Sequence, residues 1–284
     1  MILRQMQGDY QSYAELIEFY HQNKDKTFED IDLKLEGWFE APICSMLGAV
    51  IYLLQKKFNN IQVDPGVAED ILGRNGFLAF LGREKIADFQ NTTISYQLLS
   101  VTDHKYFNSY VMKELLSKPD LPQMSDLLKK KIAESIYEIF INAKMHSETE
   151  KIFTCGQFFP KKHRIEFMIT DIGIGFKENI KHRFSADLTS AQAIGWAMKN
   201  GNTTKKEVSG GIGLALLTEF IQRNKGKIQI ISGDGFWEMN GKEISGKTFP
   251  WLFPGTMVNI CVLTDDPAAY ALVSEKDISD DDIF

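Results

Sequence analysis

Two polar residues stand four positions apart in the most regular amphipathic stretch of the chain. Glu138 and Asn142 lie between Ser125 and His146, where apolar residues recur every three or four positions. This spacing predicts a helix with Ser125 as its N-cap, and it puts Glu138 and Asn142 on one side of that helix. A carboxylate and an amide so placed can hold a water and a Mg²⁺ ion, which prefers oxygen ligands. An exposed polar helix face is the alternative explanation, because such pairs are common on helices.

A second candidate for chemistry follows the apolar segment RIEFMIT. There Asp171 is followed by Gly173 and Gly175 in the pattern DIGIG. Glycines let the backbone approach a ligand closely, and an aspartate accepts a hydrogen bond from an exocyclic amine such as that of adenine. A turn from a strand into a loop uses the same residue types, so the pattern alone leaves both explanations open.

Two shorter motifs occur later in the chain. The segment from Gly210 to Leu214, GGIGL, opens a stretch with helical spacing, and Gly255-Thr256 opens the last predicted strand. Unpaired N–H groups at a helix start favour phosphate, and glycines make room for it. The threonine hydroxyl could join a base-binding network through Asp171 or a water. A tight loop and an ordinary strand start explain the two motifs without any ligand.

The patterns around these motifs predict an α+β fold. KIFTCGQFF and RIEFMIT should form a hairpin joined at 160–163, and GGIGLALLTEFIQRNKG should supply a helix. Three further strands are predicted at KIQIISG, FWEMNGKEI and GTMVNICVLT, with a turn at Asn240-Gly241. Together they make an antiparallel sheet with helices on one face.

The first part of the chain has a different pattern. Ile31 to Leu35 alternates like a half-buried strand, Ala41 to Lys57 is apolar like a buried helix, and Ile61 to Val63 is the next strand. We therefore expect a smaller mixed α/β domain at 1–118 and the antiparallel domain at 119–265, separated by a proline-containing linker. An acidic tail follows at 266–284.

Composition narrows the classes of function. The net charge of −6 argues against direct binding to nucleic acid, which needs a basic surface. The chain has no apolar run of roughly 20 residues and no hydrophobic signal-peptide core at its start, so we expect a cytoplasmic protein with no membrane contact. Cys44, Cys155 and Cys261 are scattered, which favours free thiols over a metal site or a disulfide framework.

The order of the motifs carries more information than any one of them. Four motifs in this chain resemble the N, G1, G2 and G3 motifs of the GHKL ATPase family. In order they are ExxxNA on a helix, DxGxG after a strand, GGxGL at the start of a helix, and GT in a late strand. The resemblance covers Ser125 to Thr264, and each motif has the structural context that the family requires. It implies a Bergerat-type sandwich that binds ATP or ADP with Mg²⁺.

The resemblance also implies roles for individual residues. Glu138 would be the catalytic base, Asn142 would bind Mg²⁺, and Asp171 would bind adenine with the support of Thr256. The segment 176–209 would be the mobile lid over ATP. Within it Thr203, Thr204, Lys205 and Lys206 could reach the phosphates, and a solvated surface pair is the alternative explanation for the two lysines. The residues that the resemblance assigns to the site are Glu138, Asn142, Asp171, Gly173, Gly175, Gly210, Gly211, Gly213, Leu214 and Thr256.

Within the family, NAKMHS at 142–147 resembles the anti-sigma-factor serine kinases more than the sensor histidine kinases. The first domain resembles STAS domains more faintly, and Ala41-Pro42-Ile43-Cys44 stands where that family has its phosphorylatable serine. We therefore expect an ATPase or serine-type protein kinase in a signalling system, with a regulatory protein partner. The alternative is a non-catalytic module in which ATP orders the lid and controls that partner. A homodimer is compatible with either.

Overall fold

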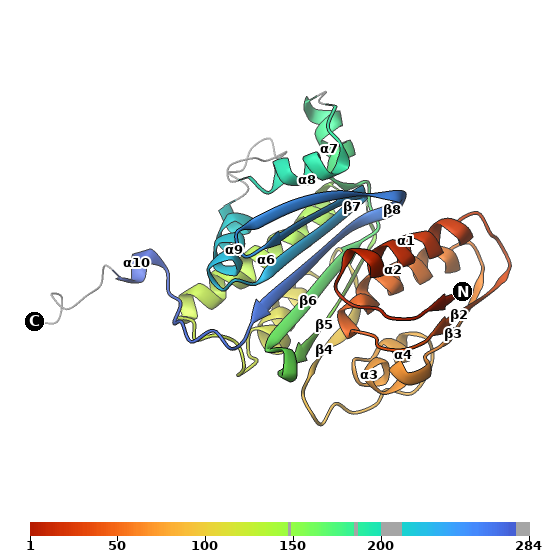
Figure 1. Ribbon diagram of the computed structural model, residues 1–284, viewed down its shortest axis with the longest axis horizontal. Helices are drawn as coiled ribbons and strands as arrows, with labels where there is room; N and C mark the ends of the chain where they lie inside the picture. The colour runs from red at the N-terminus through yellow and green to blue at the C-terminus, as the bar shows by residue number, and fades with distance from the viewer. Residues whose placement is uncertain (147–148, 185–186, 200–211, 277–284) are drawn as a thin grey trace, which may run out of the picture.

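The chain folds around two β-sheets of unequal size (Figure 1). The computed structural model describes residues 1–146, 149–184, 187–199 and 212–276. The smaller sheet is parallel, in the order β1-β2-β3, and the larger is antiparallel, in the order β4-β5-β6-β8-β7. The strands are β1 (Ile2–Leu3), β2 (Asp30–Leu35), β3 (Asn60–Asp64), β4 (Thr93–Ser100), β5 (Lys151–Phe159), β6 (Arg164–Asp171), β7 (Lys227–Asn240) and β8 (Glu243–Leu263).

Residues 1–80 form a unit that we call the N-terminal unit. Its helices α1 (Tyr10–Asn23) and α2 (Cys44–Gln55) connect the three parallel strands, and α3 (Glu69–Arg74) and α4 (Phe77–Phe80) follow. Alternate residues of β2 are buried, as the sequence predicted, and α2 starts after a 3-10 turn at Ala41–Ile43. The predicted strand, buried helix and strand of this region are therefore confirmed.

The helices α1 and α2 lie between the two sheets. They share one apolar core with the large sheet, because Phe153, Met168 and Ile231 of that sheet belong to the same cluster as Leu33 and Leu47. The opposite face of the large sheet is covered by α6 (Asp126–His146), α8 (Ser190–Ala197) and α9 (Ile212–Arg223). The remaining α-helices are α5 (His104–Tyr110), α7 (Gly175–Phe184) and α10 (Val273–Lys276).

The α+β class is confirmed, and α6, α8 and α9 of the C-terminal part lie on one face of the large sheet, but the other face is also covered. The strands β5 and β6 are buried at almost every position, which is the pattern of strands covered on both faces. The N-terminal unit supplies the second cover. None of the helices in the described ranges is both long enough and apolar enough to cross a membrane.

The strand β4, which precedes the expected boundary at 118/119, belongs to the large sheet. It pairs with β5 along the edge of the large sheet, with Leu99 opposite Ile152. Residues 93–100 therefore belong to the large sheet, and Phe107 and Leu115 after them pack in the core that α6 shares with that sheet. This strand pairs with residues more than 50 positions away, and its pattern alone gives no sign of that partner.

The long strands β7 and β8 each fold back on themselves. The N–H of Gly241 donates to the carbonyl of Gly226 at 2.9 Å, and the amide of Gln229 donates to Glu238 at 2.7 Å, so the two halves of β7 lie side by side. The reversal occurs at Gly233, whose φ is +60°. The predicted turn at Asn240-Gly241 is confirmed by the pairing of Asn240 with Glu243, but it divides FWEMNGKEI between β7 and β8.

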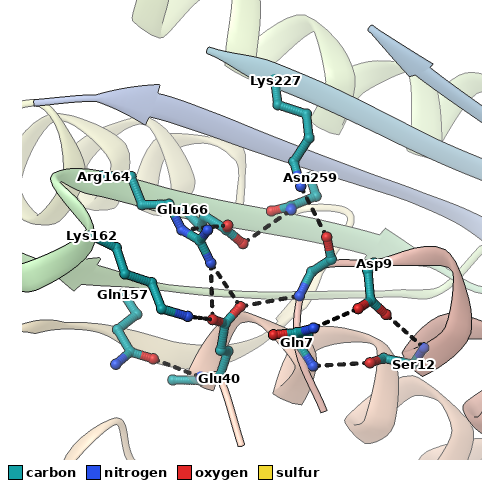
Figure 2. A network of polar contacts seen from close by, with 12 residues as sticks. Gln7, Asp9, Ser12, Glu40, Gln157, Lys162, Arg164, Glu166, Lys227 and Asn259 are labelled. Atoms are coloured by element: carbon teal, nitrogen blue, oxygen red, sulfur yellow. Dashed lines mark hydrogen bonds and ion pairs between the residues drawn. The ribbon is translucent and has the colours of Figure 1, made fainter. Parts of the chain in front are cut away.

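Polar side chains fill the middle of the contact between the N-terminal unit and the large sheet (Figure 2). We call these side chains the interlayer network. Its members are Tyr13, Glu40, Lys162, Arg164, Glu166, Lys227, Gln229 and Asn259. Glu40 is fully buried and accepts hydrogen bonds from Lys162 at 2.8 Å, Arg164 at 2.9 Å and the Gly8 N–H at 3.1 Å. Arg164 also pairs with Glu166 at 3.0 Å. Burial raises the pKa of Glu166 above its usual value, although the positive charge of Arg164 opposes the shift.

Candidate functional site

Two of the four motifs meet at one end of the large sheet. The predicted helix is confirmed as α6, with the Ser125 hydroxyl accepting from the Leu128 N–H at 3.1 Å. Its last turn leads into β5, where Ile152 pairs with Asp171 at the end of β6. Thr149, between α6 and β5, accepts a hydrogen bond from the Ile172 N–H at 3.4 Å. The end of α6 that carries Asn142 is therefore close in the fold to DIGIG.

The start of α9 reaches the same end of the sheet. This helix ends at Arg223, and β7 begins at Lys227 and runs back in the opposite direction. A helix of 12 residues is roughly 18 Å long, about the span of the six strand residues 227–232. Gly213 and Leu214 thus lie near the level of Ser232, in the first turn of α9. Gly210 and Gly211 lie outside the described residues.

Three polar side chains cross the sheet at this end, and we call them the polar row. Asp171 of β6 pairs directly with Thr256 of β8, which pairs directly with Ser232 of β7. All three point to the face that carries α6 and α9, and they are 7%, 9% and 2% exposed. Asp171 accepts a hydrogen bond from the Gly173 N–H at 2.8 Å, which closes the turn after β6.

Two glycines allow the chain to close around the polar row. Gly175 has a φ of +76°, and a Cβ there would lie 2.5 Å from the Ser232 hydroxyl. A Cβ at Gly255 would collide with the carbonyl oxygen of Asp171. The packing of this region therefore requires both glycines, whether or not a ligand binds. The strand register places Thr256 directly opposite Asp171, next to the residue that the late Gly-Thr motif was expected to support.

Some of the other predicted site residues are among those that the structure describes. Glu138 and Asn142 are both half-buried on α6, one turn apart. Residues 203–206 lie outside the described residues. Within the described ranges, no three His, Cys, Asp or Glu side chains converge on a point that could hold a metal ion. Mg²⁺ often binds through few protein ligands together with phosphate oxygens and water, so Asn142 alone fits that chemistry as a protein ligand.

The sequence did not single out Ser232, which completes the polar row. Its hydroxyl accepts a hydrogen bond from the Phe176 N–H at 2.9 Å and lies 3.3 Å from the Thr256 hydroxyl. The alternation of KIQIISG puts Ser232 on the same face as Ile228 and Ile230, but only the register between β7 and β8 brings it to Thr256. That register cannot be obtained from a single strand.

Comparison with known proteins adds no family to this description. No protein-family model matches the sequence, and no curated protein matches it.

Proposed function

We propose that the protein binds Mg·ATP at the end of the large sheet that carries the polar row. The observation that supports this most is the meeting of Asp171 with the last turns of α6 and the start of α9. In this proposal Asp171 accepts a hydrogen bond from the adenine amine. The N–H groups at the start of α9 bind the phosphates, and Asn142 contributes an oxygen to Mg²⁺.

The chemistry we propose is ATP hydrolysis or phosphoryl transfer to a serine of a protein partner, with Glu138 as the base. A half-buried carboxylate one turn from the metal ligand is suitably placed to orient a water or a hydroxyl. We propose a cytoplasmic signalling system as the setting. The second candidate is a non-catalytic module in which ATP binding controls a protein partner. The N-terminal unit favours it, because a unit packed on the large sheet gives the protein an additional surface for a partner.

The proposal is tested first by nucleotide binding. ATP with Mg²⁺ should raise the melting temperature, since a ligand at 100 times its Kd stabilises the folded state by about 2.7 kcal/mol. Asp171→Asn should then lower ATP affinity by about tenfold or more in calorimetry, because an amide replaces a charged acceptor. An asparagine oxygen can still accept from the Gly173 N–H, so the turn after β6 should persist.

The matched control is Asp265→Asn, which changes an exposed aspartate beyond the opposite end of β8. It should leave ATP affinity unchanged. Two results would count against the proposal: a wild-type protein that neither ATP nor ADP stabilises at millimolar concentration, or a folded Asp171→Asn variant that binds ATP as tightly as the wild type.

A further inference from the structure

Ser232 connects the polar row to the segment that begins at Phe176. Its hydroxyl accepts from the Phe176 N–H at 2.9 Å, in the first turn of α7, and lies 3.3 Å from the Thr256 hydroxyl. Thr256 stands directly opposite Asp171 in the β6–β8 pair. Ser232 itself is only 2% exposed, so it is too deeply buried to offer its hydroxyl to a ligand in solution.

The donors and acceptors give this connection a preferred direction. The Phe176 N–H can only donate, and an ionised aspartate such as Asp171 can only accept. Each of the two hydroxyls between them has one proton. Thr256 is the strand neighbour of Asp171 on the same face, which allows its proton to point to the carboxylate while the Ser232 proton points to Thr256. In that arrangement the hydrogen bonds would run in one direction from Phe176 to Asp171. Hydrogen bonds in such a chain polarise and strengthen one another.

We infer that Ser232 is a positioning residue that couples base binding at Asp171 to the start of α7. The inference rests on the proposed function, because it needs a base donating to Asp171. A donor there orders the carboxylate, which orders Thr256 and Ser232 in turn and holds the Phe176 N–H more firmly. Gly175 packs closely against Ser232, since a Cβ there would lie 2.5 Å from that hydroxyl.

The test measures amide hydrogen exchange at Phe176 with and without saturating Mg·ATP, and the affinities for ATP and GTP. In the wild type, ATP should slow exchange at Phe176 by about tenfold or more. In Ser232→Ala, saturating ATP should no longer slow it. ATP affinity should fall about five- to tenfold, the usual consequence of losing one buried hydrogen bond. GTP affinity should change little, because guanine has no amine to offer Asp171 in the same position.

Two further variants make the result specific. Thr256→Val removes the middle hydroxyl and should abolish the same coupling, so it serves as the test if Ser232→Ala does not fold. Ser45→Ala is the matched control, since Ser45 is also fully buried and bonds to Phe153 and Thr170, but on the opposite face of the sheet. It should keep both the ATP effect on Phe176 and the preference for ATP over GTP.

The outcomes separate this inference from the proposed function. If wild-type Phe176 responds to ATP and Ser232→Ala responds equally, Ser232 has no positioning role while ATP binding stands. A loss of coupling in Ser45→Ala equal to that in Ser232→Ala would also overturn the inference, because the effect would be general loosening. If the wild type binds no nucleotide, the proposed function fails, and the coupling fails with it.

Discussion

The two faces of the large sheet bury polar groups in different ways. On the face under α6 and α9, the core is apolar from Ile165 to Ile169 along β6, and the polar row lies at the end, where α6 stops and α9 starts. On the face under α1 and α2, polar residues such as Glu166 and Asn259 lie in the middle of the sheet, under the N-terminal unit.

The difference indicates two uses of buried polarity. In the interlayer network, polar groups of the sheet form hydrogen bonds with polar groups of the N-terminal unit. Lys227 and Gln229 both donate to the Gly8 carbonyl, and the Tyr13 hydroxyl donates to Gln229. Such a connected network fixes how two layers dock. The polar row is bordered instead by helix ends and glycine-rich turns, which is where we propose that the nucleotide binds.

This contrast predicts that removing a carboxylate near the polar row changes turnover, whereas removing one from the interlayer network changes stability. The largest effect should come from Glu138→Ala. A general base contributes about 10² to 10⁴-fold to the chemical step, so turnover should fall by that factor while ATP affinity persists. Turnover is measured as phosphate release, with and without protein partners recovered by pull-down.

Glu134→Ala is the control for this experiment, because Glu134 is exposed one turn earlier on α6, in a surface pair with Lys131. It should keep full turnover. Full turnover in Glu138→Ala would remove Glu138 from the chemistry and leave it as part of a polar helix face. A wild type without turnover under any condition would favour the non-catalytic module.

On the other face, Glu40→Ala should be the most damaging change to stability. The substitution removes the buried partner of Lys162 and Arg164, and breaking a buried pair from one side costs about 3–5 kcal/mol. Urea denaturation measures the free energy of unfolding. Glu219→Ala, which breaks an exposed pair with Arg223, should cost less than about 1 kcal/mol. Equal losses in the two variants would show that the interlayer network does not fix the docking.

The smallest effect concerns pH and distinguishes Glu166 from its neighbours. Burial raises the pKa of Glu166, so in the folded protein this group keeps its proton to a higher pH than in the unfolded chain, where its pKa is near 4.5. Its contribution to stability is therefore complete below that value and is lost as pH rises through the folded-state pKa. As pH rises through the folded-state pKa of Glu166, the free energy of unfolding should fall less in Glu166→Gln than in the wild type. Parallel pH profiles in urea denaturation would contradict this.

Local patterns in the sequence predicted much of the fold. The helix at Ser125 to His146, the hairpin of β5 and β6 and the turn at Asn240-Gly241 depend on residues close together in the chain, and all three are confirmed. The helix α1 was not predicted, although Asp9 caps it by accepting from the Ser12 N–H at 2.9 Å. It packs against β8 and α2, and its buried residues Tyr13, Leu16 and Ile17 have a helical spacing that the sequence analysis did not use.

In the candidate site, too, residues in local motifs were predicted and a residue that depends on a distant strand was not. Asp171 and Thr256 were identified by their motifs, and the structure pairs them directly. Ser232 was missed because serine at a strand end is common, and its contact with Thr256 depends on the β7–β8 register. The dual covering of the large sheet was also missed. It follows from the unbroken burial of β5 and β6, which the sequence analysis read only as a hairpin.

The interlayer network also determines when the protein can finish folding during synthesis. Tyr13 bonds to Gln229, and Gly8 bonds to Lys227, across separations of 216 and 219 residues. Contacts between such distant residues form late, because a long loop must close before they are gained. The parallel strands and their two helices therefore leave the ribosome first. The face of α1 and α2 that packs on the large sheet stays uncovered until almost all of that sheet has been synthesised. During that interval the nascent chain exposes apolar residues of α1 and α2, and it should depend on chaperones that bind such surfaces.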